Sequence, residues 1–218
     1  PVTSRTHAGL QAALNEAGIA CVTEEDSPCP YLTLPDDGKR FLSSLSANCR
    51  NNIKRKAKKL GRLGELEYRV VTDDQATALE QFFALQGIRR TEPLSEAAKQ
   101  FHRDVSVDLS DSLSLELLSL DGKDLCALYN YDYGGVRYYY LIGWDTTYDK
   151  YSPGFVAIAH SIQDAIEKRY TAFDFLRGDE PYKYHFTQSC RMNRRYVMSR
   201  SPVALRAFQC CKWLCHRV

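Results

Sequence analysis

Hydrophobic positions in the second half of the chain change from strand spacing to helical spacing near residue 145. The aromatic run at 138–144, Tyr-Tyr-Tyr-Leu-Ile-Gly-Trp, suits a half-buried strand. Apolar side chains then recur with helical spacing at Phe155, Ile158, Ala159, Ile162, Ala165 and Ile166. Ser152 suits the N-cap of this helix and Pro153 its first position. The pattern therefore predicts a strand, a polar loop and a helix in direct succession.

The same spacing rules predict the elements on either side of this stretch. Helices are expected at 6–18, 41–60, 75–90 and 95–105, and strands at 19–22, 29–35, 66–71, 114–120, 125–133 and 136–144. Asp121-Gly122 and Gly134-Gly135 are hairpin signals between the last three strands. Beyond the helix at Pro153, we expect strands at 172–176 and 196–199 and a basic amphipathic helix at 203–218. The order predicts an α/β (α+β) chain with a mixed, mostly antiparallel sheet flanked by helices.

Composition is ordinary for a soluble globular protein. Of the 218 residues, 44% are hydrophobic and 26% charged. No apolar run approaches the ~18–20 residues that a bilayer span requires, and no signal peptide opens the chain. We therefore expect a cytoplasmic protein, with peripheral contact to an inner membrane left open. Because Pro1 rather than Met comes first, we also expect a fragment or a processed chain.

The eight cysteines give no sign of a metal site. They lack paired Cys-X2-Cys spacings and histidines at finger-like intervals. The chain is also long enough to bury a core without a disulfide framework. We expect reduced thiols and no metal.

Charge is distributed unevenly along the chain. The net charge is only +2, but seven cations lie between Arg50 and Arg62 with no acid among them. Eight more lie between Lys183 and the C-terminus, again without an acid. The run at 50–62 is either a solvated helix face or a surface for a phosphorylated donor or acceptor. Nucleic acid is less favoured because the run has no interleaved aromatic residues.

Two loops combine features suited to chemistry. The first leads into the helix at Pro153, where free N–H groups and the positive end of the helix dipole suit phosphate. Gly154 allows a ligand to approach the backbone there. The second follows the strand at 172–176 and is the dense ionisable run Arg-Gly-Asp-Glu-Pro-Tyr-Lys at 177–183.

These two loops carry a family resemblance. Tyr-X3-Ser-Pro-Gly at 148–154 and Phe-Asp-Phe-Leu-Arg-Gly-Asp-Glu-X-Tyr-Lys at 173–183 resemble the CelD/BcsL family, acyltransferase-like proteins of bacterial cellulose and exopolysaccharide gene clusters. That family lies within the GNAT acetyltransferase superfamily and is related to the Fem aminoacyltransferases. The resemblance covers about residues 40–186. It implies a GNAT fold and transfer of an acyl group from acetyl-CoA or another acyl-CoA to an amine or hydroxyl of a polysaccharide or its precursor.

Roles for individual residues follow from this chemistry and this resemblance. Acyl transfer needs a base and groups that stabilise the oxyanion. The candidates are Asp179 and Glu180 as base, His185 behind them, and Arg177 and Lys183 beside them. The donor would contact Lys150, Ser152, Gly154 and Phe155, and the substrate Arg89, Asp174 and Tyr182. The loop at 177–183 is equally well explained as an ion-pair network that shapes the chain.

One departure from the GNAT pattern leaves the donor open. GNAT enzymes usually carry Arg or Gln, two residues, Gly, one residue, then Gly or Ala, whereas 150–156 contains only Gly154, and Pro153 lacks an N–H. Aminoacyl-tRNA, as in Fem enzymes, is an alternative donor, and a non-catalytic scaffold of an envelope or polysaccharide assembly is an alternative role. We expect three segments: 1–62, a remnant of a first GNAT-like half, 63–200, the GNAT-like domain, and 201–218, a basic helix.

Overall fold

The computed structural model describes residues 5–89 and 92–215. These residues form two compact units. The larger unit consists of Pro30–Leu176 and Glu180–Ser189. The smaller contains the described residues up to Cys29, the short segment Arg177–Asp179, and those from Cys190 onward. Among the described residues, no helix is long and apolar enough to cross a membrane.

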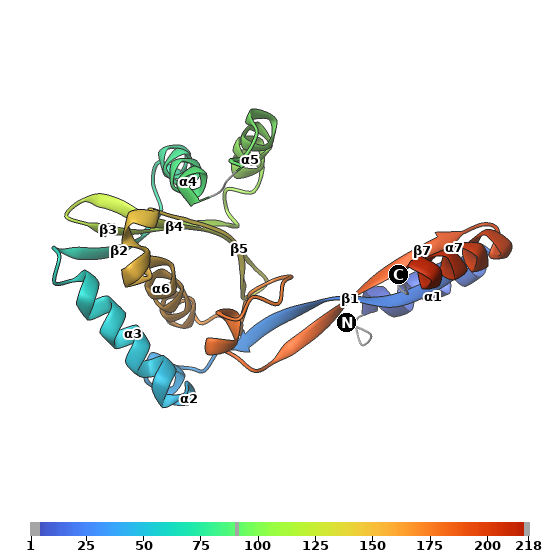
Figure 1. Ribbon diagram of the computed structural model, residues 1–218, viewed down its shortest axis with the longest axis horizontal. Helices are drawn as coiled ribbons and strands as arrows, with labels where there is room; N and C mark the ends of the chain where they lie inside the picture. The colour runs from blue at the N-terminus through green and yellow to red at the C-terminus, as the bar shows by residue number, and fades with distance from the viewer. Residues whose placement is uncertain (1–4, 90–91, 216–218) are drawn as a thin grey trace. The chain divides into compact units, whose positions relative to one another are not determined.

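A mixed, mostly antiparallel sheet forms the framework of the larger unit, as predicted (Figure 1). Its antiparallel strands are β2 (Leu66–Val71), β3 (Leu113–Leu120), β4 (Lys123–Tyr133) and β5 (Val136–Trp144). The turns between β3, β4 and β5 contain Asp121-Gly122 and Gly134-Gly135, all with positive φ, which confirms both hairpins. The short strand β6 (Ala172–Asp174) then lies parallel to the start of β5.

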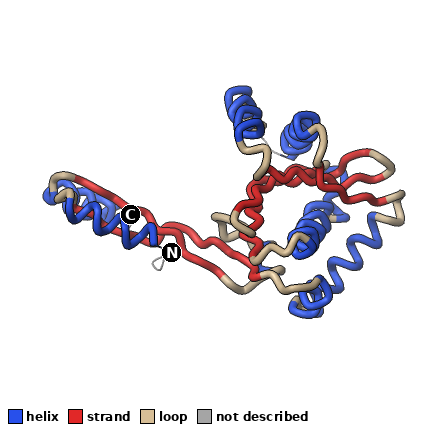
Figure 2. The backbone as a smooth tube through the Cα atoms, turned by 180° about the vertical axis from the view of Figure 1, so that it is seen from behind, coloured by secondary structure: helices blue, strands red, loops and turns tan. Residues whose placement is uncertain are grey.

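Helices cover both faces of this sheet (Figures 1 and 2). One face carries α6 (Pro153–Glu167), with α2 (Gly38–Ser44) and α3 (Ala47–Leu60) against it. The other face carries α4 (Gln75–Arg89), with α5 (Glu96–Asp108) beside it. Two apolar cores result. The first contains Val156 and Ile162 of α6 and Phe173 of β6, together with Leu118 of β3 and Leu128 of β4. In the second, α4 packs on β3 and β4.

The predicted helix at 41–60 is wrong in one respect, because the structure has two helices there. Leu45 is extended, with ψ of 151°, and Ser46 begins α3 by accepting a hydrogen bond from the N–H of Cys49. Arg50 donates to the carbonyl of Leu45 at 2.9 Å and so ties the two helices together. Ser46 is a good N-cap residue that the sparse apolar pattern of this region concealed.

The two extended segments predicted at 19–22 and 29–35 are a single strand, β1 (Ala20–Thr33). Its last residues pair with β6, with Tyr31 opposite Asp174. The prolines inside it do not end it, since their carbonyls still accept: Pro30 from the N–H of Phe175 and Pro28 from that of Gly178.

The smaller unit contains the earlier part of β1 together with three further elements. They are α1 (Arg5–Glu16), β7 (Cys190–Ser199) and α7 (Pro202–Cys215), with β7 next to β1 in the sheet order. The strand predicted at 196–199 is thus the end of a longer one. The predicted C-terminal helix is confirmed as far as residue 215, and 216–218 lie outside the described residues.

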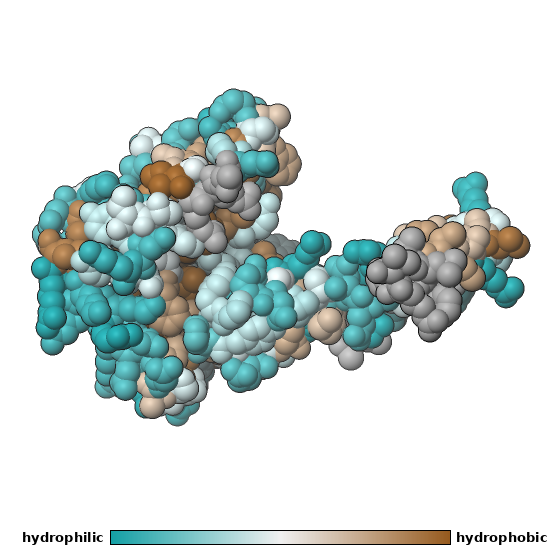
Figure 3. Space-filling model, in the orientation of Figure 1, coloured by the Kyte–Doolittle hydropathy of each residue, from teal (hydrophilic) through white to brown (hydrophobic). Residues whose placement is uncertain are grey.

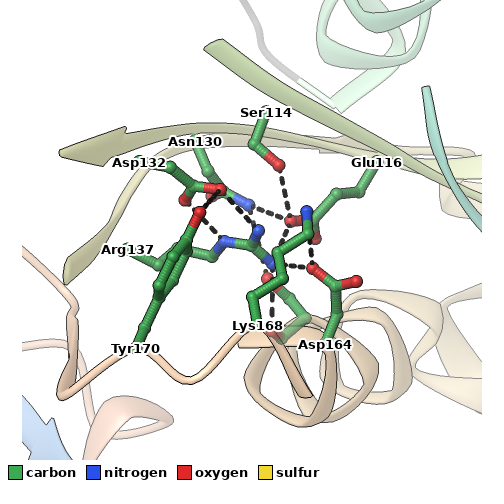
Figure 4. Close-up of polar contacts among 9 residues, drawn as sticks. Ser114, Glu116, Asn130, Asp132, Arg137, Asp164, Lys168 and Tyr170 are labelled. Atoms are coloured by element: carbon green, nitrogen blue, oxygen red, sulfur yellow. Dashed lines mark hydrogen bonds and ion pairs between the residues drawn. The ribbon is translucent and has the colours of Figure 1, made fainter. Parts of the chain in front are cut away.

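A buried ionic network joins the sheet to α6 (Figure 4). The guanidinium of Arg137, on β5, is fully buried and contacts three carboxylates at 2.7 Å, those of Glu116, Asp132 and Asp164. Its contact with Asp132 is bidentate, and it also donates to the carbonyl of Ser161. Strands β3, β4 and β5 and helix α6 are thereby held by one side chain.

Candidate active site

The N-terminus of α6 has an unusual local geometry. Ser152, at the N-cap position, is left-handed, with φ of 54° and ψ of 59°, and its side chain makes no capping bond. Ser152 and Pro153 thus occupy the predicted N-cap and first helical positions, but the serine side chain does not cap the helix. Gly154 lies against β5, where an added Cβ would be 3.0 Å from Cδ1 of Ile142 and 3.5 Å from the Trp144 ring. The first turn of α6 is thus held closely on the end of β5.

Lys56, on α3, brings a positive charge to this helix end. Its ammonium donates to the hydroxyl of Ser152 at 2.8 Å and lies 4.9 Å from the centre of the Phe155 ring. Burial lowers the pKa of Lys56, and the neighbouring Arg55 adds to that effect. Lys56 belongs to the basic run but was not among the residues predicted to contact the donor. Helical spacing from Ile53 and Leu60, which both face the core, was the available signal.

Five other cations of the basic run at 50–62 face solvent, whereas Arg50 is only partly exposed. Lys54, Arg55, Lys58, Lys59 and Arg62 are all exposed. No ion pair involving them occurs in the described part of the chain. In Figure 3 the surface over α3 is hydrophilic. The N-terminus of α6 and the exposed face of α3 therefore offer positive charge from the same side of the sheet.

The loop after β6 holds an ion pair with unequal exposure. Lys183 is only 2% exposed, and its ammonium lies 2.8 Å from the carboxylate of Glu180, which is half exposed. The hydroxyl of Tyr182 lies 3.5 Å from that of Tyr139 on β5. A buried lysine thus holds a partly solvated carboxylate in place, an arrangement suited to a base that exchanges protons with substrate or water.

The first turn of α6 contacts the segment just after the loop at 177–183 through aromatic rings. The His185 ring lies edge-on to the Phe155 ring at 5.8 Å, and Phe155 packs on Phe186 at 4.8 Å. His185, a candidate for catalysis, and Phe155, a candidate for donor binding, are therefore neighbours. Lys150 lies in the 3₁₀ turn η1 (Thr146–Tyr151), where its ammonium is 5.0 Å from the Tyr151 ring.

The remaining candidates are distributed differently. Asp174 is buried at the end of β6 and accepts a hydrogen bond from the N–H of Leu176 at 2.9 Å. Arg177 and Asp179 belong to the smaller unit, whereas Glu180, Tyr182, Lys183 and His185 belong to the larger one. Arg89 is the last residue of α4, and its side chain lies outside the described part of the structure.

Strand β6 ends next to this loop, whereas β5 continues. Their pairing covers Val136–Tyr138 against Ala172–Asp174. From Tyr139 to Trp144, β5 continues with β4 on one side and no described strand on the other. The α6 N-terminus follows β5 after the 3₁₀ turn η1, and Glu180 and Lys183 follow β6 after residues 175–179. The region beyond the carboxyl ends of neighbouring parallel strands is a common location for a ligand site.

The mixed sheet with helices on both faces is the fold of an acyltransferase. The model of the acetyltransferase (GNAT) domain family matches residues 47–184, more than half of the chain. The protein therefore belongs to the GNAT acetyltransferase family, which is the superfamily that the sequence resemblance implied.

Solved structures with the same fold share little sequence. FemX superimposes with a TM-score of 0.64 at 11% identity, over 89% of this chain and 69% of the other. The C-terminal domain of a protein described as a lysylphosphatidylglycerol synthetase, from Agrobacterium fabrum, gives a TM-score of 0.59 at 14% identity. The match covers 90% of this chain and 66% of the other. The L-PGS of Bacillus licheniformis gives a TM-score of 0.57 at 12% identity, over 88% of this chain and 64% of the other. This chain thus spans about two thirds of the structures it resembles. No curated protein matches it.

Proposed function

We propose that this chain transfers an acyl group, with acetyl as the first candidate, from acyl-CoA to an amine or hydroxyl of a saccharide. The observation that supports the donor most directly is the α6 N-terminus with Lys56 beside it. The first-turn N–H groups, the helix dipole and a partly buried ammonium all favour a diphosphate. The single glycine of this turn is packed on β5, so the backbone lies close to the end of the strand.

The proposed reaction proceeds in one ternary complex. The acceptor nitrogen or oxygen bonds to the thioester carbonyl carbon, the carbon–sulfur bond breaks, and the proton lost by the acceptor ends on the departing thiolate. Glu180 is the proposed base, because it is half exposed and held by Lys183 at 2.8 Å. Asp179 remains an alternative base and Arg177 an alternative cation, while His185 is a candidate for contact with the donor through Phe155.

Aminoacyl-tRNA is the second candidate donor. Pro153 removes one N–H from the phosphate-binding turn, and the exposed cations of α3 suit a longer polyanion than CoA. Two kinds of neighbouring structure, FemX and the lysylphosphatidylglycerol synthetases, share the fold. Anionic membrane lipid is a further ligand that those cations suit.

The test is thermal denaturation with millimolar acetyl-CoA and longer acyl-CoAs. A ligand at about 100 times its dissociation constant stabilises by ~2.7 kcal/mol, which raises the midpoint by about 5–11 °C in a chain of this size. Lys56→Met should abolish most of the shift, and Lys54→Met, which removes an exposed charge from the same helix, should preserve it. The absence of a shift with any thioester would refute the CoA donor. A charged tRNA would then be tested, and failure of both would leave the scaffold role.

A further inference from the structure

Helix α7 directs apolar residues toward solvent. Val203 is 76% exposed and Phe208 48% exposed, and Ala207 and Cys210 are exposed as well. Because Val203, Ala207 and Cys210 follow one another at helical spacing, they form one row along the helix. Figure 3 shows hydrophobic residues at the surface of the smaller unit. We define the apolar face of α7 as the exposed residues Val203, Ala204, Ala207, Phe208, Cys210 and Cys211.

The side of α7 that packs on the protein is narrow in comparison. Helix α7 packs on β7, and Leu205 is the only one of its described side chains that is buried. Leu205 is two positions from both Val203 and Ala207, so about 160° of the helix circumference separates it from them. A surface helix normally buries its apolar stripe against a core. In α7, most of the apolar side chains whose exposure is described remain exposed instead.

The smaller unit has no core that covers this face. Among its described residues, only Leu14, Cys29 and Leu205 are buried apolar side chains. They come from three different elements, α1, β1 and α7. Apolar residues gathered on one exposed face mark a site of interaction with another surface.

Cations border the apolar face. Residues 190–215 include six Lys or Arg and no Asp or Glu, and two of the six pair with acids of β1. Arg200 and Arg206 are exposed, and neither has an ion-pair partner among the described residues. Arg206 lies one helical turn from both Val203 and Cys210, at the edge of the apolar face. This combination suits a partner surface that is both negatively charged and apolar.

The charge of the smaller unit favours a lipid surface over a second copy of the chain. A second copy would bring the same cations into the contact. The described residues of the smaller unit contain eight Lys or Arg against five Asp or Glu, so two such units repel each other. An anionic bilayer has negative headgroups for the cations and acyl chains for the apolar residues.

We propose that α7 binds in the interface of an anionic lipid bilayer, with its apolar face at the acyl-chain boundary and Arg200 and Arg206 among the headgroups. Interfacial binding requires no membrane-spanning helix, since the helix lies in the plane of the bilayer surface. This binding is independent of the proposed acyl transfer, because it involves only residues of the smaller unit.

Sedimentation of the full chain with vesicles tests this binding. Phosphatidylcholine vesicles are compared with vesicles of phosphatidylcholine and phosphatidylglycerol in equal parts. A reducing agent is present because Cys210 and Cys211 are exposed thiols. We expect binding to the anionic vesicles to be at least about tenfold tighter than to the neutral ones, and to weaken as salt is raised. Failure to bind the anionic vesicles, or equal binding to both kinds, would overturn the proposal.

Val203→Glu has a closely matched control. It places a charge on the apolar face and should weaken binding to the anionic vesicles at least about tenfold. Val107→Glu changes the same residue type at nearly the same exposure, 75% against 76%, on α5 of the larger unit, and should leave binding unchanged. Because both valines are exposed, both variants should keep the melting temperature of the wild type. Equal binding by the two variants would assign the vesicle contact to another surface, such as the cations of α3, and would contradict the role of α7.

The contribution of charge and the rival of self-association are measured on the same samples. Arg200→Gln combined with Arg206→Gln should weaken binding to the anionic vesicles at least about fivefold, and unchanged binding would contradict the headgroup contacts. Sedimentation equilibrium of the wild type without vesicles should show a monomer. A dimer that Val203→Glu dissociates would assign the apolar face to a second copy and overturn the proposal.

Discussion

The guanidinium of Arg137 lies 2.7 Å from the carboxylate of Glu116, and neither side chain is exposed to solvent. The two oxygens of Glu116 are used unequally. Oε1 receives Arg137, the amide of Asn130 at 2.9 Å and the hydroxyl of Ser114 at 3.2 Å. Within the described chain, Oε2 of Glu116 and Oδ1 of Asn130 have no partner. An Oε2 without a partner in a fully buried carboxyl group favours a proton there, and burial shifts the pKa of Glu116 in the same direction.

Glu116→Gln should therefore change stability little. The NH₂ group of a glutamine can donate a hydrogen bond in place of the protonated Oε2. Its carbonyl oxygen can still accept from Arg137 in place of Oε1. Arg137→Met, in contrast, should destabilise by about 3–5 kcal/mol, because it leaves Asp132 and Asp164 partly buried without their main cation. Urea denaturation of both variants measures the difference. A loss of more than ~2 kcal/mol in Glu116→Gln would show that the carboxylate is ionised.

The pH dependence of stability provides an independent test of the same group. Burial raises the pKa of Glu116, although Arg137 opposes the shift. A carboxyl group whose folded pKa lies above its unfolded value of ~4.3 holds its proton more tightly in the folded state, so stability falls as pH rises between the two values. The stability of the wild type relative to Glu116→Gln should decrease over that window. A relative stability that rises with pH above 4.3 would contradict the assignment.

Glu180→Gln tests the proposed base. Because Glu180 is half exposed, the variant should keep the fold and its affinity for the donor, while turnover falls at least about tenfold. The control is Glu92→Gln, an exposed carboxylate outside the loop. Acyl transfer to glucosamine would be followed across pH, since loss of a base should also remove the acidic limb of the rate profile. A variant with wild-type turnover would exclude Glu180 as the base.

Gly143→Ala should be destabilising for a reason specific to its neighbours. An added Cβ would lie 2.5 Å from the backbone nitrogen of Gln86 and 2.8 Å from its Cα, so helix α4 would have to move away from β5. We expect a loss of about 1–3 kcal/mol in chemical denaturation. Gly9→Ala, within α1, has nothing within 4 Å of the new Cβ and should be neutral or stabilising by up to ~1 kcal/mol. Equal midpoints for the two variants would argue against close packing at Gly143.

The elements that the sequence predicted best are those with local signals. The Asp-Gly and Gly-Gly turns locate the hairpins, and Ser95, at the start of the helix predicted at 95–105, caps α5 by accepting from the N–H of Ala98. The interruption between α2 and α3 was missed because apolar residues are sparse there and helix propensity is high on both sides. The continuity of β1 through Pro28 and Pro30 depends on carbonyl bonds to residues far along the chain, which no local pattern reveals.

The candidate site was predictable in composition but not in geometry. The motifs identified the α6 N-terminus and the loop at 177–183, yet the division of that loop between two compact units is a tertiary property. Lys183 is buried although lysine is usually exposed, and Lys56 reaches Ser152 from 96 positions away.

The pairing of β1 with β6 also affects how the chain assembles. Tyr31 lies opposite Asp174, so the two partners are 143 positions apart, whereas β2 to β5 pair mainly through adjacent hairpins and one helical connection. Contacts of such separation form late, because loop-closure entropy must be overcome first. At a synthesis rate of ~5–20 residues per second, the β1 segment emerges roughly 7–30 s before its partner strand. Throughout that interval the N–H and C=O groups of the β1 backbone have no partner strand. The main risk of misassembly in this topology is therefore that β1 pairs with another nascent chain.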